Sequence, residues 1–260
     1  MIMSTLQSHA EQRLFPVLRL LFWRPARTRR ARIMRLVFGV LFVTVLLFRY
    51  EPSLLFANEY VHPRFVVHSD APLGSATRAI LDAATEHLRL AGIEDPAYVH
   101  RAYICNDGWR MRLLAPASTT AFAMTSPMET IVLNRCDVAA DRVFAGDRVR
   151  SLSGTLAHEA THTLLRRRYG MLAATRLPHW KCEGLCDYVA GESSFPDDEG
   201  RRLLREGADD PSTSFFYFRA RLMVEQLIRF ERLTFDDVVR RDHEETAVLE
   251  RLTSRLRATR

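Results

Sequence analysis

The sequence predicts an α+β domain behind a single N-terminal membrane helix, and three observations support this prediction. An apolar run follows an arginine-rich segment near the N-terminus. Between residues 64 and 134, strand-like runs alternate with one amphipathic helical segment, and from residue 152 onward the apolar residues have helical spacing. We therefore expect a basic tail over 1–32, a membrane segment over 33–50, a linker over 51–63 and one globular domain over 64–260.

The positive charge of the chain is concentrated at its N-terminus. The 260 residues carry a formal net charge of +6. Residues 1–49 contain nine arginines and one acid, Glu11, so the rest of the chain has 28 basic and 30 acidic residues. A nucleic-acid-binding domain needs clustered positive charge on its folded surface. The charge distribution therefore gives no support to nucleic-acid binding.

The apolar run Leu36–Phe48 is the predicted membrane segment, although its thirteen residues are few for a spanning helix. Such a helix needs about 17–25 residues, so a cleaved signal peptide is the alternative. Retention is favoured because the charged region before the run is longer than a whole signal peptide of about 15–30 residues, and because no A-x-A cleavage site follows. Arg35 at one end, and Arg49 with Tyr50 at the other, can anchor the helix at the two interfaces.

An arginine cluster before the apolar run sets the expected orientation. The positive-inside rule places the N-terminus in the cytoplasm and everything after Tyr50 on the extracytoplasmic side. The segment Leu14–Trp23 fits an interfacial helix and a plain cytosolic tail about equally well. The cluster consists of Arg24, Arg27, Arg29, Arg30, Arg32 and Arg35.

The first part of the globular domain is expected to form a small sheet with one helix packed on it. The segment Thr77–Ala91 has its apolar residues on one helical face, and Gly92 ends it. Thr119–Met124 is either an edge strand, along which an extended peptide could pair, or an interior strand or loop. The other expected strands are Arg64–His68, Val99–Cys105, Met111–Leu114 and Thr130–Asn134.

The stretch Leu156–Leu165 contains two histidines four residues apart, with a glutamate directly after the first. Positions four apart lie on one helical face, so His158 and His162 can direct imidazole nitrogens to one metal ion, and Glu159 borders that face. The helix is expected to run from about 152 to 169, because arginines suit its last turn and Gly170 suits the position after it. The alternative is a pair of core histidines beside a solvated glutamate.

A second acidic stretch follows in Pro178–Val189, where Glu183 and Asp187 are again four residues apart. With H-E-x-x-H, the W-x-x-E-G stretch Trp180–Gly184 makes residues 150–190 resemble the gluzincin metallopeptidases, the thermolysin-like and aminopeptidase-like clan, and in particular its small peptidase MA-like members. The resemblance implies a zincin-like fold, in which a small mixed sheet, the H-E-x-x-H helix and the helix of the third ligand follow one another.

The resemblance also implies that His158, His162 and Glu183 bind Zn²⁺, that Glu159 is the general base and that Asp187 accepts a hydrogen bond from His158. Three protein ligands leave the fourth tetrahedral position for a water, whose pKa zinc lowers towards ~7. A carboxylate beside that water can take its proton and pass it to the leaving amine. A ligand histidine usually needs its other N–H held, and Asp187 is placed to do this.

A donor to the developing oxyanion is expected beyond the third ligand, where related enzymes supply a tyrosine or a histidine. Tyr217 is the first choice because it opens a helix, expected over Phe215–Arg232, after the loop-like segment Glu192–Ser214. The alternative for Tyr217 is packing among neighbouring phenylalanines. Tyr188 leaves its helix away from the Asp187 face and His243 begins a polar segment, so both are weaker candidates. Further helices are expected over Phe235–Arg240 and His243–Arg257.

Four cysteines in an exported domain fit two disulfides. Cys105 and Cys136 each follow a strand-like run and are the more natural pair. Cys182 and Cys186 lie one helical turn apart, where a bridge is geometrically awkward. A zinc role for this second pair is the alternative, but a thiolate ligand would displace the water that hydrolysis requires.

The expected function is that of a membrane-anchored zinc metallopeptidase whose exported domain hydrolyses a peptide or protein substrate. One alternative is a catalytically silent, membrane-tethered binding or adaptor protein of the same fold, although the intact Glu159 argues against it. Another is a hydrolase of a non-peptide amide, which the sequence does not separate from a peptidase. The sequence leaves the substrate and the oligomeric state open.

Overall fold

The computed structural model of the protein describes residues 28–258. These residues fall into two units, the part up to Glu51 and the part from Pro52 onward. The first unit contains helix α2 (Arg29–Tyr50), which is long and apolar enough to cross a membrane and has no buried residue. The segment Leu14–Trp23, expected as an interfacial helix or a tail, lies outside the described residues.

Helix α2 is longer than the apolar run that predicted it. Thr28 caps its N-terminus, where the Thr28 hydroxyl accepts a hydrogen bond from the backbone N–H of Ala31 at 3.2 Å. Arginine is a good helix former, so the basic residues after Thr28 continue the helix. The 22 residues of α2 span about 33 Å at 1.5 Å per residue, which matches a hydrocarbon core of about 30 Å.

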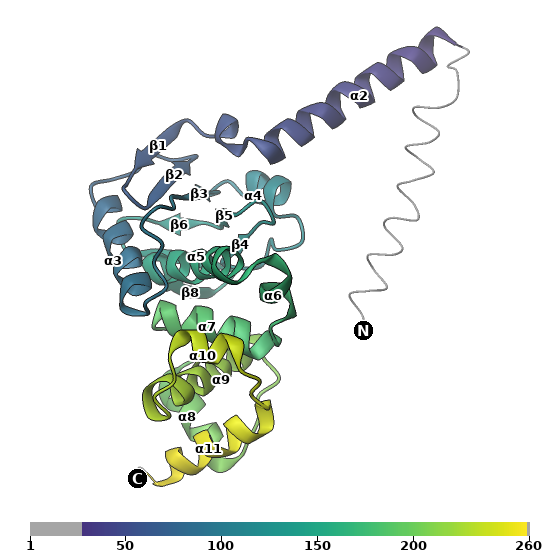
Figure 1. Cartoon of the computed structure of the whole chain (residues 1–260). Coiled ribbons are helices and arrows are strands. Elements are labelled where there is room, and N and C mark those ends of the chain that lie inside the picture. The colour runs from purple at the N-terminus through teal and green to yellow at the C-terminus, as the bar shows by residue number, and fades with distance from the viewer. Residues whose placement is uncertain (1–27, 259–260) are drawn as a thin grey trace. The chain divides into compact units, whose positions relative to one another are not determined.

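The second unit contains a five-stranded mixed sheet in the order β1-β2-β3-β5-β4 (Figure 1). Strands β2 (Phe65–Ser69), β3 (His100–Ile104) and β5 (Thr130–Leu133) are parallel and mostly buried, as expected for interior strands. At the two edges, β1 (Asn58–Val61) pairs antiparallel with β2, and β4 (Ala123–Thr125) pairs antiparallel with β5. Strand β4 therefore has one free edge in the sheet.

Helix α3 (Thr77–Leu90) connects β2 to β3 and completes a β-α-β unit. It buries one apolar face, on which Ile80, Leu81, Ala84 and Leu88 lie, as the spacing of these residues predicted. The strand predictions near β2, β3 and β5 and the helix prediction for α3 are confirmed to within a few residues.

Two predictions for this part of the chain are wrong, and a third is confirmed only in part. Residues 51–63, expected as a linker, contain the short helix η1 (Pro52–Leu55) and strand β1, because pairing with β2 orders a segment that has no clear strand pattern. Met111–Leu114 belongs to helix α4 (Trp109–Leu114), in which Met111 and Leu114 are buried. The strand expected over Thr119–Met124 is limited to β4.

A second sheet, which the sequence did not predict, leads into the motif helix. Its three antiparallel strands are β6 (Cys136–Asp137), β7 (Arg142–Ala145) and β8 (Arg148–Ser151). Charged residues interrupt their apolar alternation, so periodicity alone does not reveal them. Helix α5 (Leu152–Tyr169) follows β8 directly and has the bounds that the sequence predicted.

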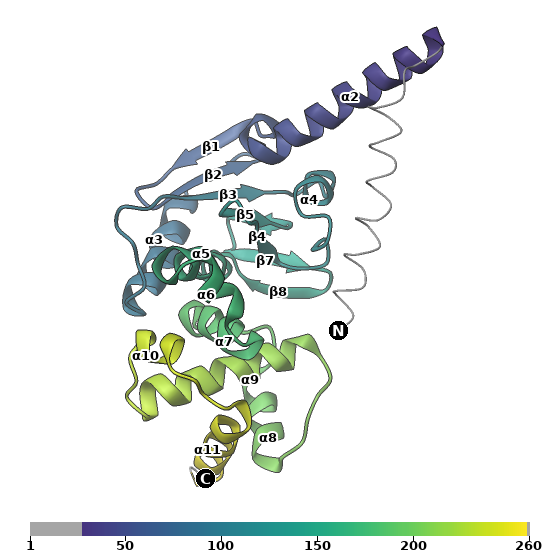
Figure 2. The ribbon, with the colours of Figure 1, turned by 45° about the vertical axis from the view of Figure 1, so that its right-hand side comes forward.

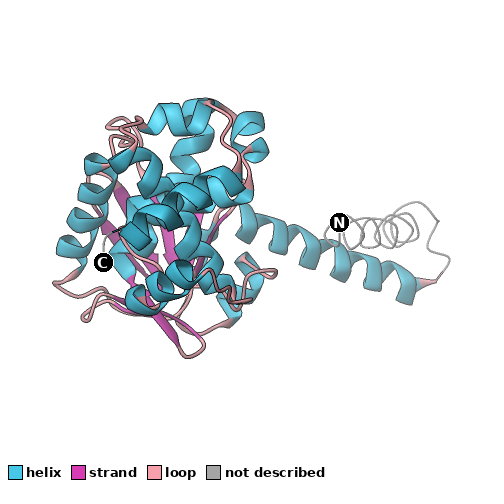
Figure 3. Ribbon diagram, turned by 90° about the horizontal axis from the view of Figure 1, so that it is seen from below, coloured by secondary structure: helices cyan, strands magenta, loops and turns pink. Residues whose placement is uncertain are grey.

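The C-terminal part is entirely helical. Helix α7 (His179–Ala190) packs against α5, and α9 (Thr213–Glu225) packs against α7. Figure 2 shows α5 between the sheets and these helices, and Figure 3 shows the helices gathered over the strands. The other helices are α6 (Met171–Arg176), α8 (Asp197–Glu206), the π-helix η2 (Gln226–Phe230), α10 (Phe235–Arg240) and α11 (Glu245–Ala258).

One hydrophobic cluster joins the five-stranded sheet to the helices. It includes Phe65 and Ile131 from the sheet, Leu156 from α5, Leu185 from α7 and Phe218 from α9. Helices α5 and α9, which pack on either side of α7, both contribute to this cluster. The position of α7 relative to α5 is therefore fixed by packing on two sides. The second unit is thus a mixed α/β domain in which α5 and α7 form the centre.

Candidate metal centre

Helix α5 brings three polar side chains into the middle of the domain. Ser151 caps its N-terminus, where the hydroxyl accepts a hydrogen bond from the backbone N–H of Gly154 at 2.9 Å. Most of the helix is uncharged on every side, and it is buried accordingly. His158 and Glu159 are each 7% exposed, and the two imidazole rings of His158 and His162 lie 5.1 Å apart.

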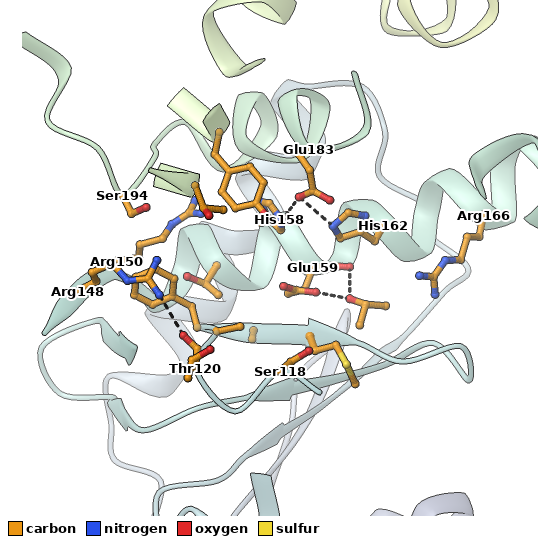
Figure 4. Close-up of a pocket in the computed structure, with 18 residues that line it drawn as sticks. Ser118, Thr120, Arg148, Arg150, His158, Glu159, His162, Arg166, Glu183 and Ser194 are labelled. Atoms are coloured by element: carbon orange, nitrogen blue, oxygen red, sulfur yellow. Dashed lines mark hydrogen bonds and ion pairs between the residues drawn. The ribbon is translucent and has the colours of Figure 1, made fainter. Parts of the chain in front are cut away.

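Helix α7 places Glu183 opposite the two histidines. Oε2 of Glu183 lies 3.4 Å from Nε2 of His158 and 3.7 Å from Nε2 of His162 (Figure 4). Two ligand atoms at about 2.0–2.1 Å from a tetrahedral zinc ion are about 3.3 Å apart. The two distances from Glu183 to the histidines are therefore compatible with a shared zinc ion, as in a His₂Glu site.

His158 is held from behind by a buried carboxylate. Nδ1 of His158 donates to Oδ1 of Asp187 at 2.7 Å, and Asp187 is fully buried. The same oxygen lies 3.0 Å from Nη1 of Arg150, which also pairs with Glu192 at 3.3 Å. This arrangement fixes the ring orientation of His158 and leaves its Nε2 for a metal ion.

The edge strand β4 holds the carboxylate of Glu159. The hydroxyl of Thr125 donates to Oε2 of Glu159 at 2.6 Å and also lies 2.9 Å from the Glu159 backbone carbonyl. A helix side chain is thus oriented by a residue from the sheet. The contact places Glu159 at the boundary between α5 and the free edge of β4.

Two cysteines of α7 contact the other ring nitrogen of His162. Sγ of Cys182 and Sγ of Cys186 lie 3.7 Å and 3.5 Å from Nδ1 of His162. All four cysteines of the chain are free thiols, including Cys105 and Cys136, which the sequence favoured as a disulfide pair. Cys182 and Cys186 therefore both contact Nδ1 of His162, where they can orient the imidazole ring, and Sγ of Cys182 also lies within 4.8 Å of Glu183.

Two groups of residues in the described part of the chain have ligand atoms within 4.8 Å of one another. The first group is His158, His162 and Cys186, and the second is His162, Cys182 and Glu183. Among these, Cys186 is fully buried, and burial together with Cys182 raises the pKa of its thiol. A neutral buried thiol is a poor metal ligand, which disfavours Cys186. The pKa of Cys182, by contrast, is lowered to about 5, chiefly by its hydrogen bond with Cys186, so its thiolate is a competent ligand beside His162 and Glu183. The set of two histidines and Glu183 is favoured because it leaves a coordination position for water.

The electrostatics of the site favour a positive charge between the histidines and Glu183. Burial lowers the pKa of His158, but hydrogen bonds with Asp187 and Glu183 raise it to about 10. Burial raises the pKa of Glu183, whereas His158 and His162 lower it to about 2. The carboxylates of Glu183 and Asp187 thus stabilise positive charge at the two histidines, and they would stabilise a metal cation bound there in the same way.

The site opens into a cavity of about 480 Å³. Residues of β4, of the segment before it and of α5 form its walls, together with Ser194 and Thr213 from the chain on either side of α8. Tyr217 of α9 also lines the cavity, and burial with the charges of Glu183, Asp187 and Glu159 raises the pKa of its hydroxyl. Tyr217 therefore keeps its hydroxyl proton, and it lines the same cavity as His158, His162 and Glu183.

The structure brings together all the site residues that the sequence singled out: His158, Glu159, His162, Glu183, Asp187 and Tyr217. Trp180 lies in the hydrophobic core, and Tyr188 packs against it. His179 is exposed at the start of α7, and its Nε2 lies 3.8 Å from Oε1 of Glu183.

Thr125 and Arg150, which contact Glu159 and Asp187, are not predicted by the sequence. Neither residue belongs to a motif, and no spacing pattern connects them to the histidines. Comparisons of the chain with protein-family models, with curated proteins and with solved structures find no match. The case for a function therefore depends on the residues of the site.

Proposed function

We propose that the protein is a membrane-anchored zinc metallopeptidase of the gluzincin type. The observation that carries this proposal is the approach of His158 Nε2 and His162 Nε2 to Glu183 Oε2, beside a buried Glu159. The donor set is that of a catalytic zinc site, since two imidazoles and one carboxylate leave a coordination position open. The family resemblance of residues 150–190 supports the same assignment.

His158, His162 and Glu183 would hold the ion, and Asp187 would fix the ring of His158. A bound zinc ion supplies a water of lowered pKa and polarises the substrate carbonyl. Glu159 takes the proton of the attacking water and delivers it to the leaving amine. Thr125 keeps the Glu159 carboxylate turned towards the cavity, and Tyr217 donates a hydrogen bond to the oxyanion.

A peptide is the favoured substrate because the free edge of β4 lines the cavity. Ala123, Met124 and Thr125 all border it, and Thr125 contacts the proposed general base. An extended chain that pairs with this edge gains main-chain hydrogen bonds and passes beside Glu159. A non-peptide amide would not use this edge.

Helix α2 supports a membrane anchor, with the arginine-rich side in the cytoplasm and the domain from Pro52 onward outside. The peptidase would then act on an extracytoplasmic peptide or protein.

The test combines metal analysis with cleavage of a broad peptide library by the detergent-solubilised full chain. Wild-type protein should contain one zinc ion, which His162→Ala and Glu183→Ala remove. Glu159→Gln should keep the ion while hydrolysis falls by ~10²-fold or more, because the amide has no basicity. The control is His179→Ala, which should retain both zinc and activity because His179 is exposed beside the other oxygen of Glu183.

Other results of the metal analysis and the cleavage assay would point to a different function or a different catalytic base. Wild-type protein without zinc would contradict the proposal. Zinc without any peptide hydrolysis would favour the silent binding or adaptor protein. Full activity of Glu159→Gln would mean that a different group is the base.

A further inference from the structure

The cavity contains an arginine that the proposed chemistry does not use. Arg166 lies on α5, four residues after His162, so it projects from the same helical face. Its side chain is partly buried, and Nη1 donates to the backbone carbonyl of Ser126 at 2.9 Å. Ser126 directly follows β4, so Arg166 stands where this strand leaves the cavity.

The charge of Arg166 is not balanced by a carboxylate in the described part of the chain. The next two arginines are balanced: Arg167 lies 3.7 Å from Asp95, and Arg168 lies 3.1 Å from Asp236. Among residues 28–258, no carboxylate oxygen lies within 4.0 Å of an Arg166 nitrogen. A guanidinium has five N–H donors, and a backbone carbonyl uses only part of them.

The other arginines of the cavity differ from Arg166. Arg150 is buried, but it is paired with Asp187 and Glu192. Arg148 is exposed and donates to the carbonyl of Thr120, with Phe122 under its guanidinium. Figure 4 shows both of them at one end of the site and Arg166 at the other, beyond His162. Among the three arginines that line the cavity, Arg166 is thus the one that is partly buried and has no carboxylate partner in the described part of the chain.

The position of Arg166 relates it to the scissile bond. Four residues of helix separate it from His162, which is about 6 Å along the axis. An extended peptide advances about 3.3 Å per residue, so this distance corresponds to about two residues of substrate. Thr125 contacts Glu159. The next residue, Ser126, contacts Arg166, so a chain that follows β4 passes from the proposed general base to Arg166.

We infer that Arg166 is a specificity-determining residue that binds a substrate carboxylate about two residues from the scissile bond. The inference rests on the proposed peptidase function and adds the substrate class. A guanidinium fork matches a carboxylate bidentately, and the partial burial of Arg166 strengthens such a pair relative to one in water. A neutral residue at the same position would leave the guanidinium without its partner.

The carboxylate can belong to an acidic side chain or to a free C-terminus. A substrate antiparallel to β4 runs from N- to C-terminus in the direction from Ser126 to Ala123, so Arg166 faces residues before the scissile bond. Only a side chain can supply a carboxylate there. If the substrate instead runs parallel to β4, Arg166 faces residues after the scissile bond. Only in that direction can a free C-terminal carboxylate reach Arg166.

The test uses the detergent-solubilised full chain and fluorogenic peptides whose cleavage site is mapped by mass spectrometry. Each of the three positions on either side of the scissile bond carries Glu or Gln in turn, with a free or an amidated C-terminus. Wild-type kcat/KM should be ~10–100-fold higher for Glu at one position about two residues away. A preference that depends on the free C-terminus instead would identify the terminal carboxylate as the source.

Arg166→Gln should abolish this preference by lowering kcat/KM for the Glu peptide alone, and Arg166→Lys should restore part of it. The matched control is Arg167→Gln, which removes the same charge one residue away and should keep the wild-type ratio. Zinc content should be equal in all four proteins. An unchanged Glu-to-Gln ratio in Arg166→Gln, or an equal loss in Arg167→Gln, would overturn the inference.

A binding experiment separates this inference from the proposed function. The Glu159→Gln protein, with and without Arg166→Gln, is titrated with the same labelled peptides by fluorescence anisotropy. Binding that requires both the carboxylate and Arg166 supports the inference even if no peptide is hydrolysed. Hydrolysis by the wild-type protein with no carboxylate preference, and equal binding of Glu and Gln peptides, would refute the inference and leave the peptidase proposal standing.

Discussion

At the scale of single residues, the site depends on partners that come from other elements. His158, Glu159 and His162 belong to α5, but the groups that orient them lie on α7 and β4. Each contact crosses a packing interface between elements. Substitution of a residue that makes one of these contacts should therefore change the geometry of the site, although the proposed ligands His158, His162 and Glu183 are themselves unchanged.

Asp187→Asn should weaken zinc binding by ~10–100-fold without abolishing it, because the amide is a poorer acceptor for the His158 N–H. Zinc affinity can be measured by competition with a chelating dye. The matched control is Glu192→Gln, which removes the other carboxylate beside Arg150 but does not touch His158. Similar losses of zinc affinity in both variants would mean that zinc affinity depends on the ion pairs of Arg150 and not on the hydrogen bond between Asp187 and His158.

Thr125→Val keeps the shape of the side chain but removes the hydrogen bond to the Glu159 carboxylate. We expect kcat to fall by ~10-fold, with zinc content unchanged, because loss of a hydrogen bond to a charged group releases the base from its position. Thr155→Val is the control, since Thr155 lines the same cavity but donates to the Ser151 carbonyl. If the two variants have the same kcat, Thr125 has no positioning role.

Tyr217→Phe removes only the hydroxyl that the proposal assigns to the oxyanion. We expect kcat to fall by ~10²–10³-fold while zinc content and thermal stability remain nearly unchanged. Tyr188→Phe is the control, because Tyr188 is a partly buried tyrosine that packs against the core. Loss of the fold in Tyr217→Phe would identify a packing role, and undiminished kcat would exclude Tyr217 as the donor.

At the scale of elements, the position of α7 decides where Glu183 lies. Gly184 lets α7 approach α9 closely, because a Cβ at this position would lie 2.5 Å from the backbone carbonyl oxygen of Ala220. That oxygen belongs to a buried helix and cannot move aside alone. The adjacent residue Glu183, a proposed zinc ligand, is therefore held at a contact between two helix backbones.

Gly184→Ala should lower the free energy of unfolding by ~1–3 kcal/mol and weaken zinc binding, because α7 must shift away from α9. Gly74→Ala is the control, since a Cβ at Gly74 meets nothing within 4 Å. Chemical denaturation and zinc titration of both variants test the prediction. Wild-type values for both quantities in Gly184→Ala would show that the two helices can separate without moving Glu183.

The elements that the sequence predicted well are those with local boundary residues. Helix α5 has its expected bounds because Ser151 caps it and Gly170, with a φ of 88°, ends it. The segment 111–114 was assigned to the wrong structure because its few apolar residues fit a strand and a helix equally well. Burial of Met111 and Leu114 from a helix is a tertiary preference that no local pattern expresses.

At the scale of the whole molecule, the domain from Pro52 onward has its own core, and α2 is a separate unit. We expect the full chain to remain in the membrane fraction after carbonate extraction. A chain that begins at Pro52 should be soluble and bind zinc with the same stoichiometry. The intact mass of the mature protein, whether it is in the membrane or the soluble fraction, decides between a retained helix and a signal peptide, because cleavage after the apolar run would remove α2.

The sequence alone determined the ligand spacing, since residues four apart on a helix share a face whatever surrounds them. It also located the apolar segment that became α2, because length and composition are local properties. From these features and the family resemblance, all six proposed site residues could be named before the structure was known.

Only the tertiary structure decided which groups surround those residues. Thr125 is 34 positions from Glu159, and Arg150 is 37 positions from Asp187, so no helical or strand period relates them. Their contacts exist because β4 and β8 pack beside α5 and α7, and this packing depends on burial summed over the whole core. Arg166 has no carboxylate partner among the described residues for the same reason. Only the folded chain shows which side chains lie close to its guanidinium.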